Sequence, residues 1–188
     1  MSGMRLLVAI ELPDAIKYRL AALCSGLHGA KWTDPAQMHL TLRFVGEVDA
    51  PVAGDIADAL GQVFAPRFEL ELAGIGDFTA RGRPQVLWVG VRLNAALATL
   101  QGKVEAAVRR AGIAPEPRKF HPHVTLARFD RGGGWTNFVR YVTAHEPFAA
   151  GPFAVDEFVL FRSVLGSEGA THHVEVTYPL TYARDAAE

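Results

Sequence analysis

The sequence predicts an α+β protein built mainly from antiparallel sheets. Two observations lead to this prediction. Seven segments have the residue pattern of strands, and three others carry apolar residues at helical spacing. Their order is β-α-β-α-β-β-α-β with two late strands, so strict β-α-β alternation of a parallel sheet is missing.

The strand-like segments are rich in β-branched and aromatic residues, or alternate between apolar and polar residues. At 67–74, Phe68, Leu70 and Leu72 share one face while Glu69 and Glu71 share the other. That alternation predicts a half-buried strand. The seven predicted strands are 5–12, 38–45, 67–74, 86–91, 120–128, 153–161 and 171–178.

The predicted helices span 14–27, 52–64 and 95–111, with a shorter one around 136–142. Asp14 is a candidate cap for the first helix, and Gly112 suits the end of the third. The glycine run at 131–134 lacks the Lys-Ser/Thr of a phosphate-binding P-loop, so we interpret it as a flexible loop.

Composition narrows the class of protein. The chain has 188 residues, of which 49% are hydrophobic and 21% charged, with a formal net charge of −1. This balance is typical of a soluble globular domain and argues against a large, uniformly basic nucleic-acid surface. Because Cys24 is the only cysteine, an internal disulfide is impossible. No apolar run approaches the ~20 residues of a membrane span, so we expect a cytoplasmic protein that does not associate with a membrane. We also expect a monomer.

The tetrapeptide His-x-Thr-Leu occurs twice, as HLTL at 39–42 and as HVTL at 123–126, each inside a predicted strand. Chance alone gives about 0.04 copies in a chain of this composition, so the repetition is a strong signal. The two copies flank the middle of the chain, which suggests two related halves.

On a strand, residues two apart point to the same face. His39 and Thr41 therefore project together, as do His123 and Thr125. Two imidazoles can perform acid–base chemistry near neutral pH, and threonine hydroxyls can donate hydrogen bonds to a phosphoryl oxygen. This set fits hydrolysis of a phosphodiester such as a ribose 2′,3′-cyclic phosphate, and the mechanism requires no metal.

The segments MHLTLRFVGEV and FHPHVTLARF resemble the two signature segments of the 2H phosphoesterase superfamily. Within it, the chain is similar over nearly its whole length to the RNA 2′,3′-cyclic phosphodiesterases, once named 2′-5′ RNA ligases. The resemblance implies a single bilobal domain spanning 1–188, with two pseudo-symmetric halves, helices outside and an active-site groove between the lobes. It also implies that His39 is the proton donor and His123 the proton acceptor, that Thr41 and Thr125 hold the phosphate, and that there is no metal or cofactor.

Four flanking residues are candidates to bind substrate. Strand alternation places Arg43 with the first motif, but it directs Arg128 away from the second unless a β-bulge intervenes. The resembled family commonly has arginine at the second position, so we expect Arg128 to contact phosphate. Phe44 is a candidate to contact a base, and His121 a candidate substrate contact.

The histidines at 172 and 173 lie on a late predicted strand. Because adjacent strand residues point to opposite faces, both cannot line one site, and we interpret both as structural.

Three alternatives stay open at this point. The same residues would serve a 2′-5′ ligase or 2′-5′ phosphodiesterase acting on tRNA halves or oligonucleotides. A binding module for RNA ends or small cyclic nucleotides would need them without turnover. A histidine-ligated metal protein fits less well, because threonine is a poor ligand and no carboxylate sits beside either motif.

Overall fold

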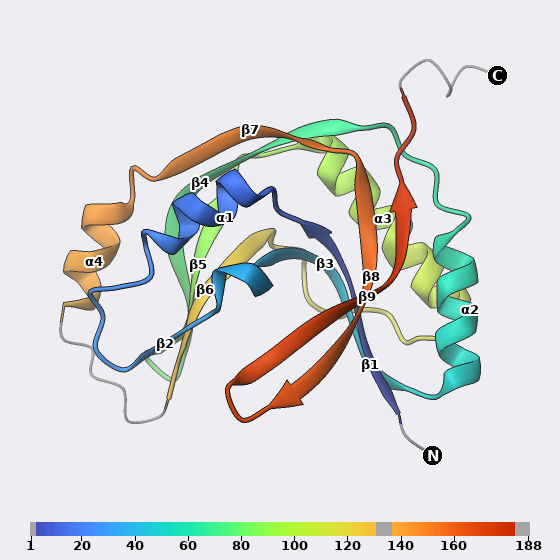
Figure 1. Ribbon diagram of the computed structural model, residues 1–188, viewed down its shortest axis with the longest axis horizontal. Helices are drawn as coiled ribbons and strands as arrows, with labels where there is room; N and C mark the ends of the chain where they lie inside the picture. The colour runs from blue at the N-terminus through green and yellow to red at the C-terminus, as the bar shows by residue number, and fades with distance from the viewer. Residues whose placement is uncertain (1–2, 131–136, 183–188) are drawn as a thin grey trace.

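The fold is α+β, as the sequence predicts. A computed structural model describes residues 3–130 and 137–182, and these ranges contain two antiparallel sheets and four α-helices (Figure 1). The first sheet has the order β3-β1-β8-β9, and the second β2-β6-β5-β4-β7. The strands are β1 (Met4–Glu11), β2 (Ala30–Trp32), β3 (His39–Val48), β4 (Phe68–Ala80), β5 (Arg83–Val91), β6 (His123–Phe129), β7 (Ala149–Val155), β8 (Glu157–Gly166) and β9 (Gly169–Pro179).

The helices pack against strands of the two sheets. They are α1 (Asp14–Ala21), α2 (Ala50–Leu60), α3 (Ala95–Arg110) and α4 (Phe138–His145), with a 3₁₀ turn η1 (Pro35–Gln37). α2 and α3 pack together and against β1 and β3, whereas α4 packs against β4 at the opposite end of the molecule (Figure 1).

The ends of the helices follow from local sequence in most places. Asp49 caps α2 and Asn94 caps α3, each accepting a hydrogen bond from a main-chain N–H three residues on. Gly112 follows α3 with φ +95°, a conformation that glycine adopts without strain, which confirms its predicted role. The predicted Asp14 cap is wrong, because α1 begins there with Pro13 at its cap position and no side-chain cap bond.

Several predicted boundaries need correction. The single strand expected at 153–161 is two strands, since the chain leaves the second sheet at the end of β7 and enters the first with β8. The change of sheet falls at Asp156 and Glu157, where two acidic residues interrupt the apolar run. The first helix ends at Ala21, β4 continues to Ala80, and β2 was not predicted. The glycine run at 131–134 lies outside the described residues.

One connected hydrophobic core joins the two sheets, with buried residues from β1 and β3 packed together with those from β4, β5 and β6. A separate small cluster lies on the other face of the first sheet: Leu7, Ala9, Val159 and Phe161. The division of the domain into two pseudo-symmetric halves stays a prediction. In the part of the chain that the structure describes, we find no helix with the length and hydropathy of a membrane span.

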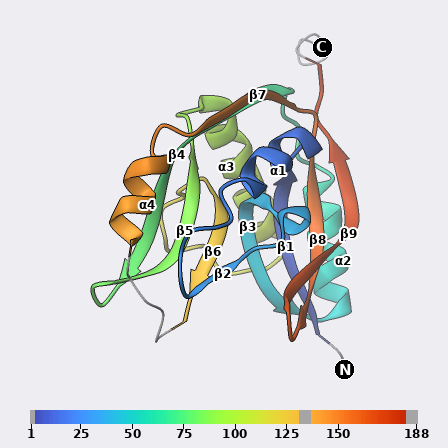
Figure 2. The ribbon, with the colours of Figure 1, turned by 60° about the vertical axis from the view of Figure 1, so that its left-hand side comes forward.

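The two strands that carry the repeated tetrapeptide, β3 and β6, lie side by side where the sheets meet (Figure 2). In each strand the histidine is the first residue. The fold thus brings together two segments that are far apart in the sequence.

Candidate active site

The first motif sits on a strand with a β-bulge directly after its threonine. Thr41 pairs with Ala9 and Phe44 pairs with Leu7, so the extra residue on β3 lies between them at Leu42. Because the two partners on β1 share a face, Thr41 and Phe44 share one as well. We call this side of the first sheet, which also holds His39, its motif face.

Arg43 does not lie on the motif face, so its predicted position is wrong. The bulge turns it to the other side, where it pairs with Val8 and is only 7% exposed. Its guanidinium donates hydrogen bonds to the carboxylate of Glu105 and to the main-chain carbonyl oxygens of Phe44 and Ala114. Arg43 is therefore a buried structural residue that ties β3 to α3 and to the segment before β6.

The second motif repeats this bulge. Thr125 pairs with Trp88 and Arg128 pairs with Val86, which leaves Leu126 in the bulge. Trp88 and Val86 are two apart on β5 and share a face, so Arg128 points to the same side as Thr125. The interruption of strand alternation that the family resemblance suggested is present, and Arg128 is exposed on the motif face of the second sheet.

Both motif imidazoles are held in the same tautomer. The Nδ1 of His39 donates to the carbonyl oxygen of Gln37 at 2.9 Å, and the Nδ1 of His123 donates to that of His121 at 2.7 Å. A carbonyl oxygen only accepts, so each neutral ring carries its proton on Nδ1 and keeps Nε2 as an acceptor. The Nε2 of His39 accepts from the hydroxyl of Thr41 at 3.0 Å.

The surroundings favour the neutral form of both rings. Burial, followed by the nearby charges of His172, Lys17 and His123, lowers the pKa of His39 to about 4. Burial also lowers the pKa of His123, with smaller contributions from the nearby charges of His121 and Arg128. At neutral pH and without substrate, each ring therefore offers an unprotonated Nε2.

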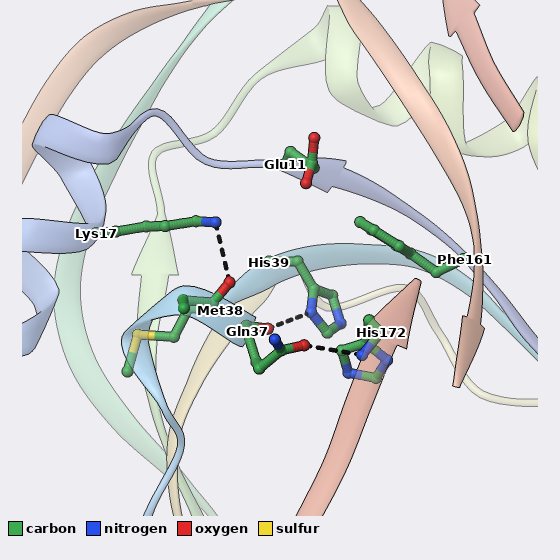
Figure 3. A pocket seen from close by; sticks show the side chains of 8 residues that line it. Glu11, Lys17, Gln37, Met38, His39, Phe161 and His172 are labelled. Atoms are coloured by element: carbon green, nitrogen blue, oxygen red, sulfur yellow. Dashed lines mark hydrogen bonds between the residues drawn. The ribbon is translucent and has the colours of Figure 1, made fainter. Parts of the chain in front are cut away.

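A small polar hollow opens beside His39 (Figure 3). Its wall includes His172 from β9, whose ring centroid lies 4.7 Å from that of His39, with an angle of 87° between the two ring planes. The interpretation of His172 as a structural residue missed this contact, because the sequence does not give the path of the late hairpin. The other lining residues are Glu11, Lys17, Ala36, Gln37, Met38 and Phe161.

An aromatic cluster surrounds His123. The ring of Phe78 lies 4.9 Å from His123, and that of Trp88 lies 4.9 Å from His121. Trp88 lies directly over Gly76, where a Cβ atom would come within 2.2 Å of the indole. His121 is thus part of the wall beside the second motif, as an exposed ring.

Phe44 occupies the place on the first sheet that corresponds to the place of Arg128 on the second, because each follows the bulge after its motif threonine. Its side chain is 40% exposed, and the guanidinium of Arg5 lies 4.9 Å from the centre of its ring. After the bulge, the first strand therefore presents an aromatic ring where the second presents Arg128. Among the described residues, no group of three or more histidine, cysteine, aspartate or glutamate side chains is arranged to hold a metal ion.

Comparisons with known proteins agree with one another. Residues 12–166 match the family described as the 2′-5′ RNA ligase superfamily. The RNA 2′,3′-cyclic phosphodiesterase of Aeropyrum pernix is 36% identical over 140 residues, covering 74% of this chain and 80% of the relative. That of Archaeoglobus fulgidus is 30% identical over 169 residues, covering 88% and 94%. The crystal structure of E. coli LigT complexed with 3′-AMP superimposes with a TM-score of 0.77 at 25% identity, covering 96% of this chain and 99% of that one.

Proposed function

The chain belongs to the 2′-5′ RNA ligase superfamily, and from that premise we propose that it hydrolyses RNA 2′,3′-cyclic phosphate ends to 2′-phosphates. The proposed reaction uses His39 and His123 as a general acid and base, and it uses no metal ion. The observation that carries the proposal is the tautomer of the two imidazoles. Both rings carry their proton on Nδ1, which leaves Nε2 as an acceptor. The Nε2 of His39 lies 3.0 Å from the hydroxyl of Thr41, and the strand that carries His123 and Thr125 lies beside the strand that carries His39.

The proposed base is His123. Its Nε2 takes a proton from water as the water oxygen attacks phosphorus. The phosphorus–O3′ bond breaks, and the departing 3′ oxygen takes a proton from Nε2 of His39. The product carries a 2′-phosphate and a 3′ hydroxyl, so one water is consumed for each bond broken. This assignment of the two roles follows the family resemblance.

His39 has to gain a proton before it can act as the acid. A bound phosphate anion places negative charge beside the ring and favours its protonated form, against the burial that lowers its pKa in the free protein. Once Nε2 carries a proton, it can no longer accept the hydroxyl hydrogen of Thr41. That hydrogen is then free for a phosphoryl oxygen, so protonation of His39 and phosphate binding by Thr41 support each other.

The remaining contacts divide between the two sheets. Thr125 and Arg128 lie on the motif face of the second sheet and are proposed to bind the non-bridging oxygens, for which a guanidinium is well suited. Phe44 lies on the same sheet as the acid, where the sugar departs, and is proposed to stack on the base or ribose. Base stacking of this kind contributes about 1–3 kcal/mol. His121 is proposed as an additional substrate contact beside His123.

The test is hydrolysis of an RNA oligonucleotide with a 2′,3′-cyclic phosphate end, and of a nucleoside 2′,3′-cyclic phosphate, with EDTA present. We expect turnover in EDTA, and ³¹P NMR should show a 2′-phosphate as the only product. Loss of activity in EDTA that returns with a divalent ion would overturn the metal-free mechanism. A 3′-phosphate product would overturn the assignment of the leaving oxygen.

The name of the superfamily also refers to 2′-5′ ligation, which would use the same groups in reverse. Incubation of tRNA halves that carry a 2′,3′-cyclic phosphate and a 5′ hydroxyl tests this second activity, because a joined 2′-5′ product differs in length from the hydrolysed end. The proposal includes a monomeric, cytoplasmic enzyme, and light scattering coupled to size-exclusion chromatography tests the first of these two points.

A further inference from the structure

The ring of His172 packs against the ring of the proposed acid. The two imidazoles meet edge to face, with centroids 4.7 Å apart (Figure 3). The ring of Phe161 is close to both, at 6.0 Å from His39 and 5.9 Å from His172. The three rings form a triangle, so His39 contacts two rings that come from β8 and β9, at the far end of the sequence.

Gln37 links His172 to His39 through hydrogen bonds. Its side-chain Oε1 accepts from the main-chain N–H of His172 at 2.8 Å, and its own carbonyl oxygen accepts from Nδ1 of His39 at 2.9 Å. One residue therefore fastens β9 to the turn before β3 and also fixes the tautomer of the acid. The position of the His172 ring and the orientation of the His39 ring depend on the same short segment.

The Nδ1 of His172 is buried, and in the described part of the chain it has no hydrogen-bond partner. A buried N–H without an acceptor is costly, whereas a bare ring nitrogen is less so, and His172 should therefore carry its proton on Nε2 and stay neutral. Burial lowers its pKa in the same direction. The charged or titratable groups around the hollow and near this ring are Arg5, Glu11, Lys17, His39 and His173.

We propose that His172 is a positioning residue for His39. Its neutral ring, fastened through Gln37, fixes the plane of the His39 imidazole so that Nε2 stays directed at Thr41 and the substrate, and His172 transfers no proton itself. The assignment of His39 as the general acid rests on the function proposed above. The edge-to-face contact and the Gln37 link are independent of that function.

Two substitutions separate the shape of the His172 ring from its nitrogens. His172→Phe keeps a planar ring and removes both nitrogens, and kcat should stay within about threefold of the wild type. His172→Ala removes the ring, and kcat should fall about tenfold to a hundredfold, as expected when a catalytic group is held loosely. KM should change less than about threefold, because the phosphate contacts remain. His173→Ala is the matched control, since His173 is adjacent and exposed, and it should behave like the wild type.

The kinetic results decide between the two roles. A His172→Ala enzyme with wild-type kcat would overturn the proposal, and so would a His172→Phe enzyme that loses as much as His172→Ala. The second result would mean that a ring nitrogen takes part in the chemistry. Far-UV circular dichroism of each variant shows whether the fold is retained.

A measurement that needs no turnover separates this proposal from the function. In ¹⁵N–¹H NMR spectra of the wild type, His39 should show a single Nδ1–H tautomer. In His172→Ala its nitrogen shifts should move towards a mixture of tautomers, and in His173→Ala they should not. If the His39 nitrogen shifts change in this way but the wild-type protein hydrolyses no cyclic phosphate, the positioning role is supported and the proposed function is refuted. Unchanged His39 shifts in a folded His172→Ala protein would refute the positioning role.

Discussion

Replacing Arg43 with methionine should destabilise the protein and leave its site intact. The substitution keeps most of the apolar stem and removes a guanidinium that is 7% exposed. That group donates to the carboxylate of Glu105 and to the main-chain carbonyl oxygens of Phe44 and Ala114. Ala114 lies in the segment before the second motif strand. The same substitution at Arg128, which is exposed on the motif face, should have the opposite pattern of effects.

The expected size of the effect follows from these contacts. Removing one partner of a buried ion pair costs about 3–5 kcal/mol. Water reaches part of this network, since the side chain of Glu105 is 20% exposed, so we take the low end, about 3 kcal/mol. For a chain of this size, each kcal/mol lowers Tm by about 2–4 °C, which gives a decrease of about 6–12 °C. Arg128→Met should change stability by less than about 0.5 kcal/mol.

Thermal unfolding and steady-state kinetics at a temperature where both variants are folded provide the assay. For Arg43→Met we expect kcat/KM within about threefold of the wild type. For Arg128→Met, KM should rise about tenfold or more, the equivalent of one lost charged hydrogen bond. An unchanged Tm together with a raised KM in Arg43→Met would refute the structural role and restore the position that strand alternation predicts.

Two further predictions concern packing and pH. Gly76→Ala should lower the free energy of unfolding by about 1–3 kcal/mol, because the new Cβ would meet the indole of Trp88. Gly54→Ala, on the open face of α2, should raise the free energy of unfolding by about 0.5–1 kcal/mol. Urea unfolding measures both changes. The pair His39 and His123 should give a bell-shaped kcat/KM profile with its maximum below pH 6.5, because burial lowers both pKa values and alkaline pH removes the proton of the acid. For the same reason the unfolded chain binds more protons than the folded protein below pH 6.5, so the free energy of unfolding should decrease from pH 6.5 towards pH 4. A kcat/KM profile with its maximum above pH 7 would contradict the burial of the pair. A free energy of unfolding that increases on acidification from pH 6.5 to pH 4 would contradict it as well.

Local pattern was sufficient for the fold class and for the two motifs. The alternation of apolar and polar residues identified most strands, and the spacing of His39 and Thr41 placed both on one face without any knowledge of the sheet. The same reasoning applied to the second motif. Short-range spacing is reliable there because it depends only on the geometry of one strand.

Features that depend on pairing between strands were not predictable from local pattern, although the family resemblance suggested the bulge before Arg128. The bulge after each motif exchanges the expected directions of Arg43 and Arg128, and a bulge is a property of two strands in register. The contact of His172 with His39 requires the path of the hairpin between β8 and β9, which no local pattern in the sequence specifies. The pair of adjacent histidines offered one signal: if that strand borders the site, one of the two must face it.

The most direct test of the central claim is hydrolysis of a 2′,3′-cyclic phosphate RNA end by the His39→Ala and His123→Ala variants, measured in EDTA beside the wild type. We expect turnover by the wild type and a loss of at least a hundredfold in kcat for each variant, since each removes one of the two proton transfers. The double variant should lose little more than either single variant, because the two residues act as a unit. Near wild-type turnover in either single variant would contradict the account.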